Sequence, residues 1–170
     1  MKRLVLRSSL GLAGLVGLVA CSAGEASPTA GVVTMQFPST QAAVATDFVQ
    51  LFVFDVTPEQ REKVCLEKIG ARKNQEPLNA SLTPPPWNIC ELLAGRRPAT
   101  IPYGEKAILA VAQRKDRNNE LQDFMIGCAV QTLGDGDAPI PVRLALLDVR
   151  TPVPDTNCAT VGDYCNSRCQ

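Results

Sequence analysis

Five short apolar runs, each followed by turn residues, constrain the fold of this 170-residue chain more than any other feature. They are rich in β-branched and aromatic residues and span 32–37, 48–56, 107–113, 124–132 and 142–149. Runs of this length and composition, separated by Pro, Gly or charged residues, predict strands. The last three are close in sequence and predict a meander of two hairpins. We therefore expect a mainly β protein, an antiparallel β-sandwich of about six or seven strands.

Apolar residues alternate within these runs, as in strands whose successive side chains point to opposite faces. In the run 124–132, one face holds Phe124, Ile126, Cys128 and Val130, and the other holds Met125, Gly127 and Ala129. In the last run, Val142, Leu144 and Leu146 oppose Arg143, Ala145 and Leu147. In neither run is the second of these two faces uniformly polar. We therefore expect a second sheet, helices or loops to cover both faces.

An insertion at residues 57–100 separates the second run from the third. Thr57-Pro58-Glu59-Gln60 has the pattern of a capping box with Pro at the first helical position, which predicts a helix from Pro58 to about Ile69. Asn88-Ile89-Cys90-Glu91 is a second capping box and predicts a short helix through Ala94, with Gly95 as its stop. The expected domain, residues 31–150, thus carries one or two short helices between its strands.

The N-terminal segment has the composition of an export signal. Lys2, Arg3 and Arg7 supply positive charge, and residues 8–20 are uncharged and mostly apolar. This apolar stretch suits a signal peptide and is shorter than the roughly 20 residues that span a bilayer as a helix. It ends in Leu18-Val19-Ala20-Cys21, which resembles the lipobox of bacterial lipoproteins. The alternative is an ordinary secretory signal with an incidental cysteine.

The lipobox resemblance implies a cellular location. It implies that residues 1–20 are a lipoprotein signal peptide, and that Cys21 carries acyl chains such as palmitate that anchor the mature chain in a bilayer. Residues 21–30 are small and mostly polar and predict a lipidated tether. Many enteric lipoproteins held in the inner membrane have Asp where this chain has Ser22, so the resemblance favours the outer membrane. We expect an envelope protein on the periplasmic or surface face.

Six cysteines remain after the lipobox: Cys65, Cys90, Cys128, Cys158, Cys165 and Cys169. An even number in an exported chain predicts disulfides, in a pattern that the sequence does not choose. We favour a bond from a helix to Cys128, made by either Cys90 or Cys65. The Cys-rich tail, residues 151–170, has little apolar content, so disulfides must hold it in place. A zinc site is the weaker alternative because the chain has no His and no Cys-x-x-Cys, and we predict no metal ligand.

Composition limits the function. The chain has 17 Lys and Arg against 17 Asp and Glu, and loss of residues 1–20 leaves 14 against 17, a net charge of −3. A mildly acidic protein does not suit nucleic acid, so we expect no such partner. The absence of His excludes Ser-His-Asp and Cys-His catalysis, and the chain has no P-loop or Gly-x-Ser-x-Gly motif. We predict no catalytic residue, no enzyme activity and no cofactor.

Two further features have a structural and a functional interpretation. Trp87 follows three prolines. Exposed there, it would make a partner contact, whereas a buried Trp87 would hold the loop onto the sheet. The acidic segments Asp116–Glu120 and Asp135-Gly136-Asp137 predict hairpin turns in preference to calcium sites, because they lack the other oxygen ligands of a calcium loop.

The order of the strands resembles that of the Ig-like or transthyretin-like (carboxypeptidase-regulatory-like) sandwiches of bacterial surface lipoproteins. The residues that carry the resemblance are Ile101-Pro102-Tyr103-Gly104 and Ile126-Gly127-Cys128-Ala129, each of which leads into a strand or hairpin. The resemblance implies a binding or structural component of the envelope, anchored in the bilayer and in contact with other envelope proteins. It transfers no functional residue. The alternative is a small envelope enzyme or a ligand-capturing lipoprotein with an unrecognised pocket.

Overall fold

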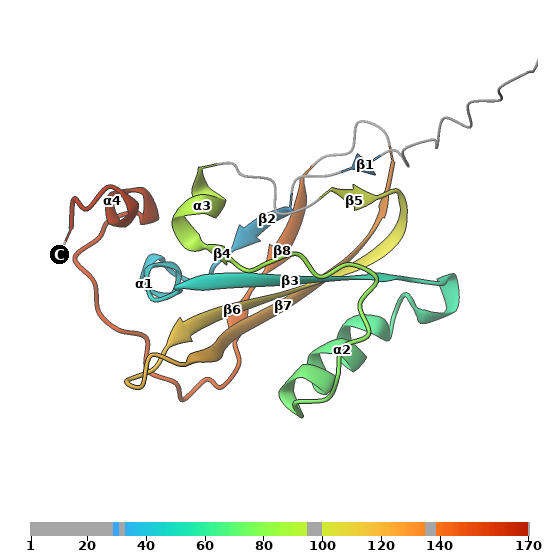
Figure 1. Cartoon of the computed structure of the whole chain (residues 1–170), viewed down its shortest axis with the longest axis horizontal. Coiled ribbons are helices and arrows are strands. Elements are labelled where there is room, and N and C mark those ends of the chain that lie inside the picture. Colours follow the sequence, from blue (N-terminus) through green and yellow to red (C-terminus); the bar gives the residue numbers. More distant parts are fainter. Residues whose placement is uncertain (1–28, 31–32, 95–99, 135–138, 170) are drawn as a thin grey trace, which may run out of the picture.

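The computed structural model describes residues 29–30, 33–94, 100–134 and 139–169 (Figure 1). Its main element is a five-stranded antiparallel sheet with the order β4-β3-β6-β7-β9. Short helices lie around the sheet, and a disulfide lies near the C-terminus. The prediction of a mainly β protein with an antiparallel sheet and a few short helices is confirmed.

Three long strands form the middle of the sheet: β3 (Phe48–Asp55), β6 (Gly104–Lys115) and β7 (Leu121–Leu133). The predicted hairpin between β6 and β7 is present, and both strands are longer than predicted. At its end, the Asp116 carboxylate accepts hydrogen bonds from the backbone N–H groups of Asn118 and Glu120, at 2.8 and 3.0 Å. Asn119 adopts φ +66°, a left-handed conformation that Asn tolerates. The segment is therefore a hairpin turn, as predicted.

Within the described residues, six shorter strands complete the β structure. At the edges of the sheet, β4 (Trp87–Asn88) pairs with β3, and β9 (Ala145–Leu146) pairs with β7. Separately, β2 (Val33–Gln36) and β8 (Ile140–Arg143) form a parallel pair. The last two, β1 (Thr29–Ala30) and β5 (Ile101–Pro102), form an antiparallel pair.

The predicted second hairpin is wrong in part, because the run 142–149 is split between two partners. Its beginning belongs to β8, which pairs with β2, and only Ala145–Leu146 pairs with β7. The chain crosses β7 at Gly127. A Cβ atom built on Gly127 would lie 2.1 Å from the carbonyl oxygen of Arg143, a distance that no side chain can occupy. The crossing therefore depends on a close backbone approach that alternation along one strand does not reveal.

The helices of the described residues are short. They are α1 (Thr40–Val44), the 3₁₀ turn η1 (Pro58–Gln60), α2 (Val64–Lys73), α3 (Ile89–Leu93) and α4 (Val161–Cys165). The capping box at Thr57 begins the 3₁₀ turn, and the α-helix starts four residues after Gln60 and continues past Ile69. The structure confirms the helix after Asn88, whereas α1 and α4 were not predicted.

The two faces of the sheet have separate cores. On one, which we call the β2 face, sheet residues such as Leu51, Ile108 and Met125 pack with residues of β2, β8 and α1. On the other, the α2 face, sheet residues such as Phe54, Leu109 and Ile126 pack with Val64 and Ile69 of α2. The expectation that both faces are covered is confirmed.

Phe124 lies on the face opposite to the predicted one. It was expected to share a face with Ile126 and Cys128, but it packs in the core of the β2 face together with Met125. The register between β6 and β7 shifts at this point, where Ala112 pairs with Met125 and Gln113 pairs with Asp123. A β-bulge inserts one extra residue into a strand and reverses the alternation beyond it.

Candidate functional site

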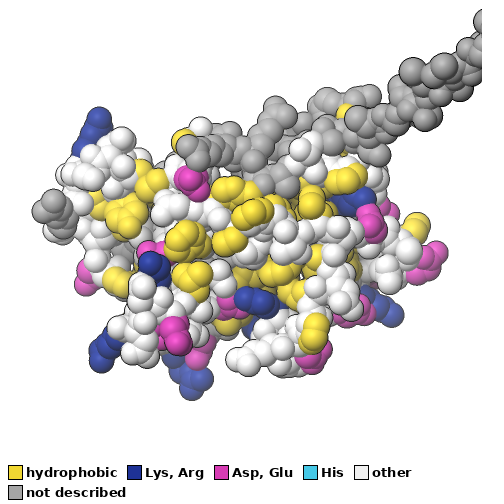
Figure 2. All heavy atoms as spheres, in the orientation of Figure 1, with side chains coloured by type: hydrophobic (Ala, Val, Ile, Leu, Met, Phe, Trp, Pro, Cys, Tyr) yellow, Lys and Arg dark blue, Asp and Glu magenta, His cyan; other side chains and the backbone are white. Residues whose placement is uncertain are grey.

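An apolar groove of about 700 Å³ lies where β2, α1, α3 and α4 meet. Val33, Thr34, Met35, Phe37, Ser39, Thr40, Ala43, Ile89, Leu92 and Val161 line it. The N-terminal part of the described chain thus forms this site together with the insertion and the C-terminal tail. Figure 2 shows hydrophobic side chains gathered across the middle of the displayed face of the molecule, with charged side chains mostly around its periphery.

Local capping interactions position two walls of the groove. After Pro38 the hydroxyl oxygen of Ser39 accepts a hydrogen bond from the Ala42 N–H at 3.1 Å and begins α1. Asn88 begins α3 in the same way, because its Oδ1 accepts from the Cys90 N–H at 2.8 Å. Ala43 and Ile89 are each 2% exposed, so both walls rest firmly on the protein interior.

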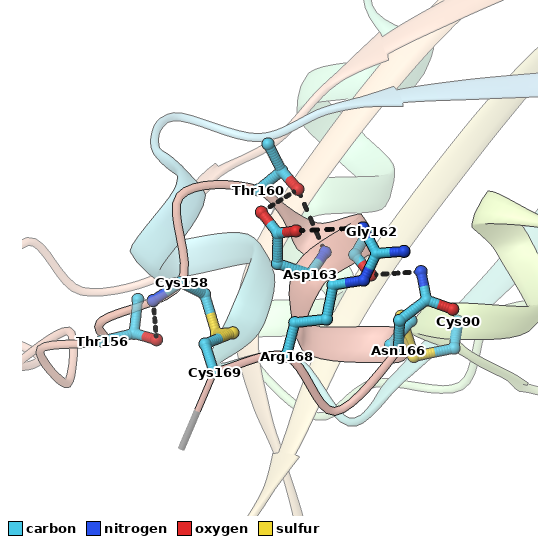
Figure 3. Close-up of a disulfide and its surroundings, with 10 residues drawn as sticks. Cys90, Thr156, Cys158, Thr160, Gly162, Asp163, Asn166, Arg168 and Cys169 are labelled. Atoms are coloured by element: carbon cyan, nitrogen blue, oxygen red, sulfur yellow. Dashed lines mark hydrogen bonds and ion pairs between the residues drawn. A yellow bond between two sulfur atoms is a disulfide. The ribbon is translucent and has the colours of Figure 1, made fainter.

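The third wall, α4, belongs to the C-terminal tail. Thr160 begins this helix, because its hydroxyl accepts from the Asp163 N–H at 3.0 Å and donates to the Asp163 carboxylate at 2.7 Å. Cys165 forms a disulfide with Cys90 of α3, and Cys158 forms one with Cys169 (Figure 3). The tail is therefore held by disulfides, as its composition predicted.

The groove offers apolar surface and three hydroxyl groups. No residue that lines it, in the part of the chain that the structure describes, carries a charge. Its size lies within the range of pockets that hold small ligands, roughly 300–1,000 Å³. Such a lining favours the burial of uncharged apolar groups. Two of its hydroxyl groups already bond within the protein, because Thr34 donates to the carbonyl oxygen of Ile140 at 3.4 Å and Ser39 accepts from Ala42.

The α2 face carries a polar cluster outside the groove. Arg72 on α2 makes two hydrogen bonds to the Asp123 carboxylate, at 2.6 and 2.9 Å, and Gln113 donates to the same carboxylate at 2.9 Å. Partial burial alone would raise the pKa of Asp123, but these hydrogen bonds outweigh it and hold the pKa below its usual value. Near this cluster, Cys65 of α2 is bonded to Cys128 of β7. The favoured bond to Cys128 therefore comes from Cys65, one of the two alternatives.

A separate ion pair joins Lys106 of β6 to Asp55 of β3, and the two residues lie opposite each other in the sheet. Lys106 is 7% exposed, and its ammonium donates a hydrogen bond to Asp55. That hydrogen bond lowers the pKa of the Asp55 carboxyl. Asp55 also lines a smaller hollow of about 420 Å³ beside Glu67 and Lys68. As an ionised carboxylate it serves there as a hydrogen-bond acceptor and counter-charge.

Several predicted residues have a defined place. Trp87 lies in β4, is half-buried and packs against the core of the β2 face. The six cysteines of the described residues all form disulfides. Cys21 and the segment Asp135-Gly136-Asp137 lie outside the described residues.

No three His, Cys, Asp or Glu side chains of the described residues form a group that could hold a metal ion. No described helix has the length and apolar character needed to cross a bilayer.

The groove itself was not predicted from the sequence. Its walls come from distant segments, and although the run 32–37 and the Asn88 capping box predicted β2 and α3, no local pattern brings these walls together. Thr160-Val161-Gly162-Asp163 has the spacing of a capping box and would have predicted α4. Comparison with protein-family models, curated proteins and solved structures finds no match to this chain.

Proposed function

We propose that this protein is a lipid-anchored component of the bacterial cell envelope whose folded head binds other envelope proteins without catalysing a reaction. The lipobox-like segment before Cys21 supports the anchor. The apolar groove supports the binding role, because burial of apolar surface is the main driving force for protein association. The groove is the single observation that carries the binding proposal.

The proposal includes the architecture of the head and its location. The β2–β8 pair shares a core with the β2 face of the sheet, which supports an Ig-like or transthyretin-like sandwich in which this pair belongs to the second layer. Ser22 supports the outer membrane, on its periplasmic or surface face.

A second candidate function is the capture of a small apolar ligand. The size of the groove favours it, because pockets for small molecules have similar volumes. A fluorescent fatty acid added to the purified protein tests this alternative. Saturable binding that a groove variant abolishes would favour ligand capture over protein binding.

The anchor is tested by expression of the full chain in a bacterium that acylates lipoproteins, followed by intact mass spectrometry of the membrane fraction. We expect a chain that begins at Cys21 and carries the added mass of acyl groups. The variant Cys21→Ser should lose both the added mass and the membrane association. An unmodified full-length chain in the cytosol would contradict the proposal.

The binding role is tested with two matched variants, each of which replaces one apolar residue by Glu. Val161→Glu puts a charge into the groove, and Leu66→Glu puts one on α2, where Leu66 is 75% exposed. Each variant is captured from solubilised membranes, and co-purifying proteins are quantified by mass spectrometry. We expect a partner that the parent protein and Leu66→Glu retain and that Val161→Glu loses. Equal recovery with all three proteins, or recovery with none, would refute a role for the groove.

A further inference from the structure

Of the three helices that line the groove, α4 is attached differently from α1 and α3. Ala42 and Ala43 of α1 and Ile89 of α3 are buried, whereas α4 has no buried residue. Its side chain in the groove, Val161, is half-buried. Hydrophobic packing therefore contributes much less to the position of α4 than to that of α1 or α3.

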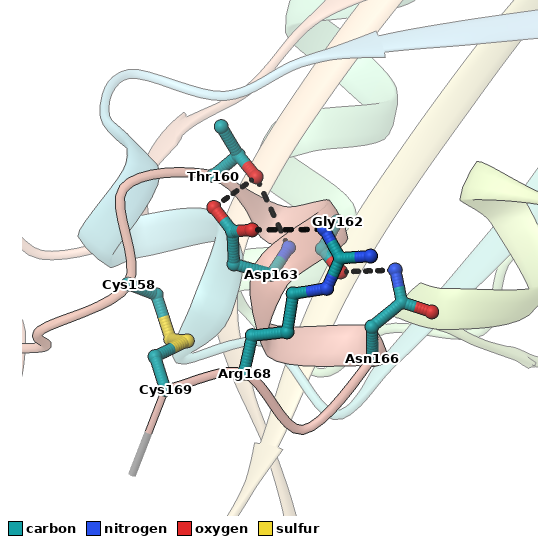
Figure 4. Close-up of polar contacts among 7 residues, drawn as sticks. All are labelled: Cys158, Thr160, Gly162, Asp163, Asn166, Arg168 and Cys169. Atoms are coloured by element: carbon teal, nitrogen blue, oxygen red, sulfur yellow. Dashed lines mark hydrogen bonds and ion pairs between the residues drawn. A yellow bond between two sulfur atoms is a disulfide. The ribbon is translucent and has the colours of Figure 1, made fainter.

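Among the described residues, the polar contacts of α4 do not compensate for this weak packing. The interactions drawn in Figure 4 connect Thr160 with Asp163, Gly162 with Asn166, and Asp163 with Arg168. They shape α4 and the turn after it, but all of them join residues of the tail to one another. Besides the backbone that leads into α4, the Cys90–Cys165 disulfide is the covalent cross-link between this described helix and the body of the protein.

The second disulfide of the tail has a different effect. Cys158 and Cys169 are only 11 residues apart, so their bond closes a small loop within the tail. Cys90 and Cys165 are 75 residues apart, and their bond joins two walls of the groove to each other. Loss of the first bond loosens the tail locally, whereas loss of the second removes the covalent link that holds α4 against α3.

We propose that the Cys90–Cys165 disulfide is a redox-sensitive latch of the groove. With the bond intact, α4 closes one side of the groove. A dithiol reductant opens the latch: its thiolate attacks one sulfur, the resulting mixed disulfide is resolved by its second thiol, and two electrons and two protons pass to Cys90 and Cys165. The released α4 then moves away and exposes the remaining apolar lining. This proposal concerns regulation of the site in the proposed function and rests on that function for its biological meaning.

Two methionines make the latch testable without knowledge of the partner. Met35 is half-buried and lines the groove, whereas Met125 is fully buried in the sheet. Peroxide oxidises an accessible methionine to its sulfoxide, and peptide mass spectrometry measures the rate at each position. Opening of the groove should accelerate oxidation of Met35, and an intact core should keep Met125 slow.

The test compares the double variant Cys90→Ser/Cys165→Ser with the matched control Cys158→Ser/Cys169→Ser, both in the full-length chain. We expect Met35 oxidation to rise by about fivefold or more in the first variant and by less than about twofold in the control, with Met125 slow in both. An unchanged Met35 rate in the first variant would overturn the latch. An equal rise in both variants would also overturn it, because the whole tail, and not this bond, would then cover the groove.

A titration of the parent protein with dithiothreitol covers the case in which the first variant fails to fold. Alkylation and mass spectrometry give the order in which the three disulfides are reduced, and Met35 oxidation is followed in the same samples. Acceleration that coincides with loss of Cys90–Cys165 supports the latch, and acceleration only after loss of Cys65–Cys128 refutes it. Neither readout depends on a partner or on the lipid, so a failure here is distinct from a failure of the proposed function.

Discussion

The two faces of the sheet are covered by different means. On the β2 face, the backbone around Arg143 crosses β7 directly above Gly127, and strands and α1 fill the core. On the α2 face, α2 and residues of the segment after it, such as Leu78 and Ala80, provide the cover, and α2 is tied to β7 by a disulfide and an ion pair. Figure 1 shows α2 apart from the β2–β8 pair.

Because they are covered differently, the two faces should tolerate different kinds of substitution. A close backbone crossing leaves no room for an added methyl group, because protein interiors are close-packed. A helix on the surface of a sheet tolerates small changes in volume, and its position depends on a few strong links. We therefore expect the β2 face to be sensitive to residue size and the α2 face to be sensitive to loss of its links.

The largest effect is expected for Gly127→Ala. The new Cβ atom would lie 2.1 Å from a backbone oxygen, which cannot move aside as a side chain can. The free energy of unfolding should fall by about 4 kcal/mol or more, or the protein should fail to fold. Urea denaturation measures it.

The matched control is Gly70→Ala, in the middle of α2, where a Cβ atom would have no neighbour within 4 Å. It should raise the free energy of unfolding by about 0.5–1 kcal/mol, because Ala favours a helix more than Gly does. Equal effects of the two substitutions would contradict the contrast between the faces.

A smaller effect is expected for Cys65→Ser/Cys128→Ser. The bond joins residues 63 positions apart, and its loss should lower the free energy of unfolding by about 2–4 kcal/mol, as is typical for disulfides. Packing of Val64 and Ile69 and the Arg72–Asp123 pair should keep α2 in place. Hydrogen exchange of the α2 backbone amides shows whether the helix stays in place. Full loss of their protection would show that the disulfide alone holds α2.

The Arg72–Asp123 pair should make the free energy of unfolding depend on pH. Because the fold lowers the pKa of Asp123, the stabilisation is present above the unfolded-state pKa of about 4 and is lost as the pH falls through the folded-state value. The cluster is partly exposed, so Asp123→Asn should cost about 1 kcal/mol at pH 7.

The same variant should lose less stability than the parent protein between pH 5 and 3, a range of about two units around the unfolded-state value. Urea denaturation across this range measures the difference. Parallel pH profiles would show that Asp123 does not contribute to acid sensitivity.

The smallest effect is expected for Thr160→Ala, which removes the cap of α4. Loss of a cap costs about 1 kcal/mol in the helix concerned. Because α4 has no buried residue, this cost should appear as faster hydrogen exchange in residues 161–165, with the urea midpoint unchanged. A large fall in the midpoint would mean that α4 supports the whole fold.

The sequence predicted features that arise from neighbouring residues. Alternation and composition located the central strands and the hairpin at Asp116–Glu120, and the Asn88 cap located α3. The two-residue strands β1, β4 and β5 escaped prediction because so short a segment has no periodicity. The groove escaped because Val33, Leu92 and Val161 come from three distant segments.

The amino-acid sequence was enough to predict strands, a few capped helices and a set of disulfides, because these depend on local propensity and on the number of cysteines. The folded structure was needed to show that Cys65, and not Cys90, is bonded to Cys128, and that the bulge turns Phe124 to the β2 face. It also showed that the chain crosses at Gly127. Each of these outcomes depends on which distant residues pack against each other, and no local pattern along the chain carries that information.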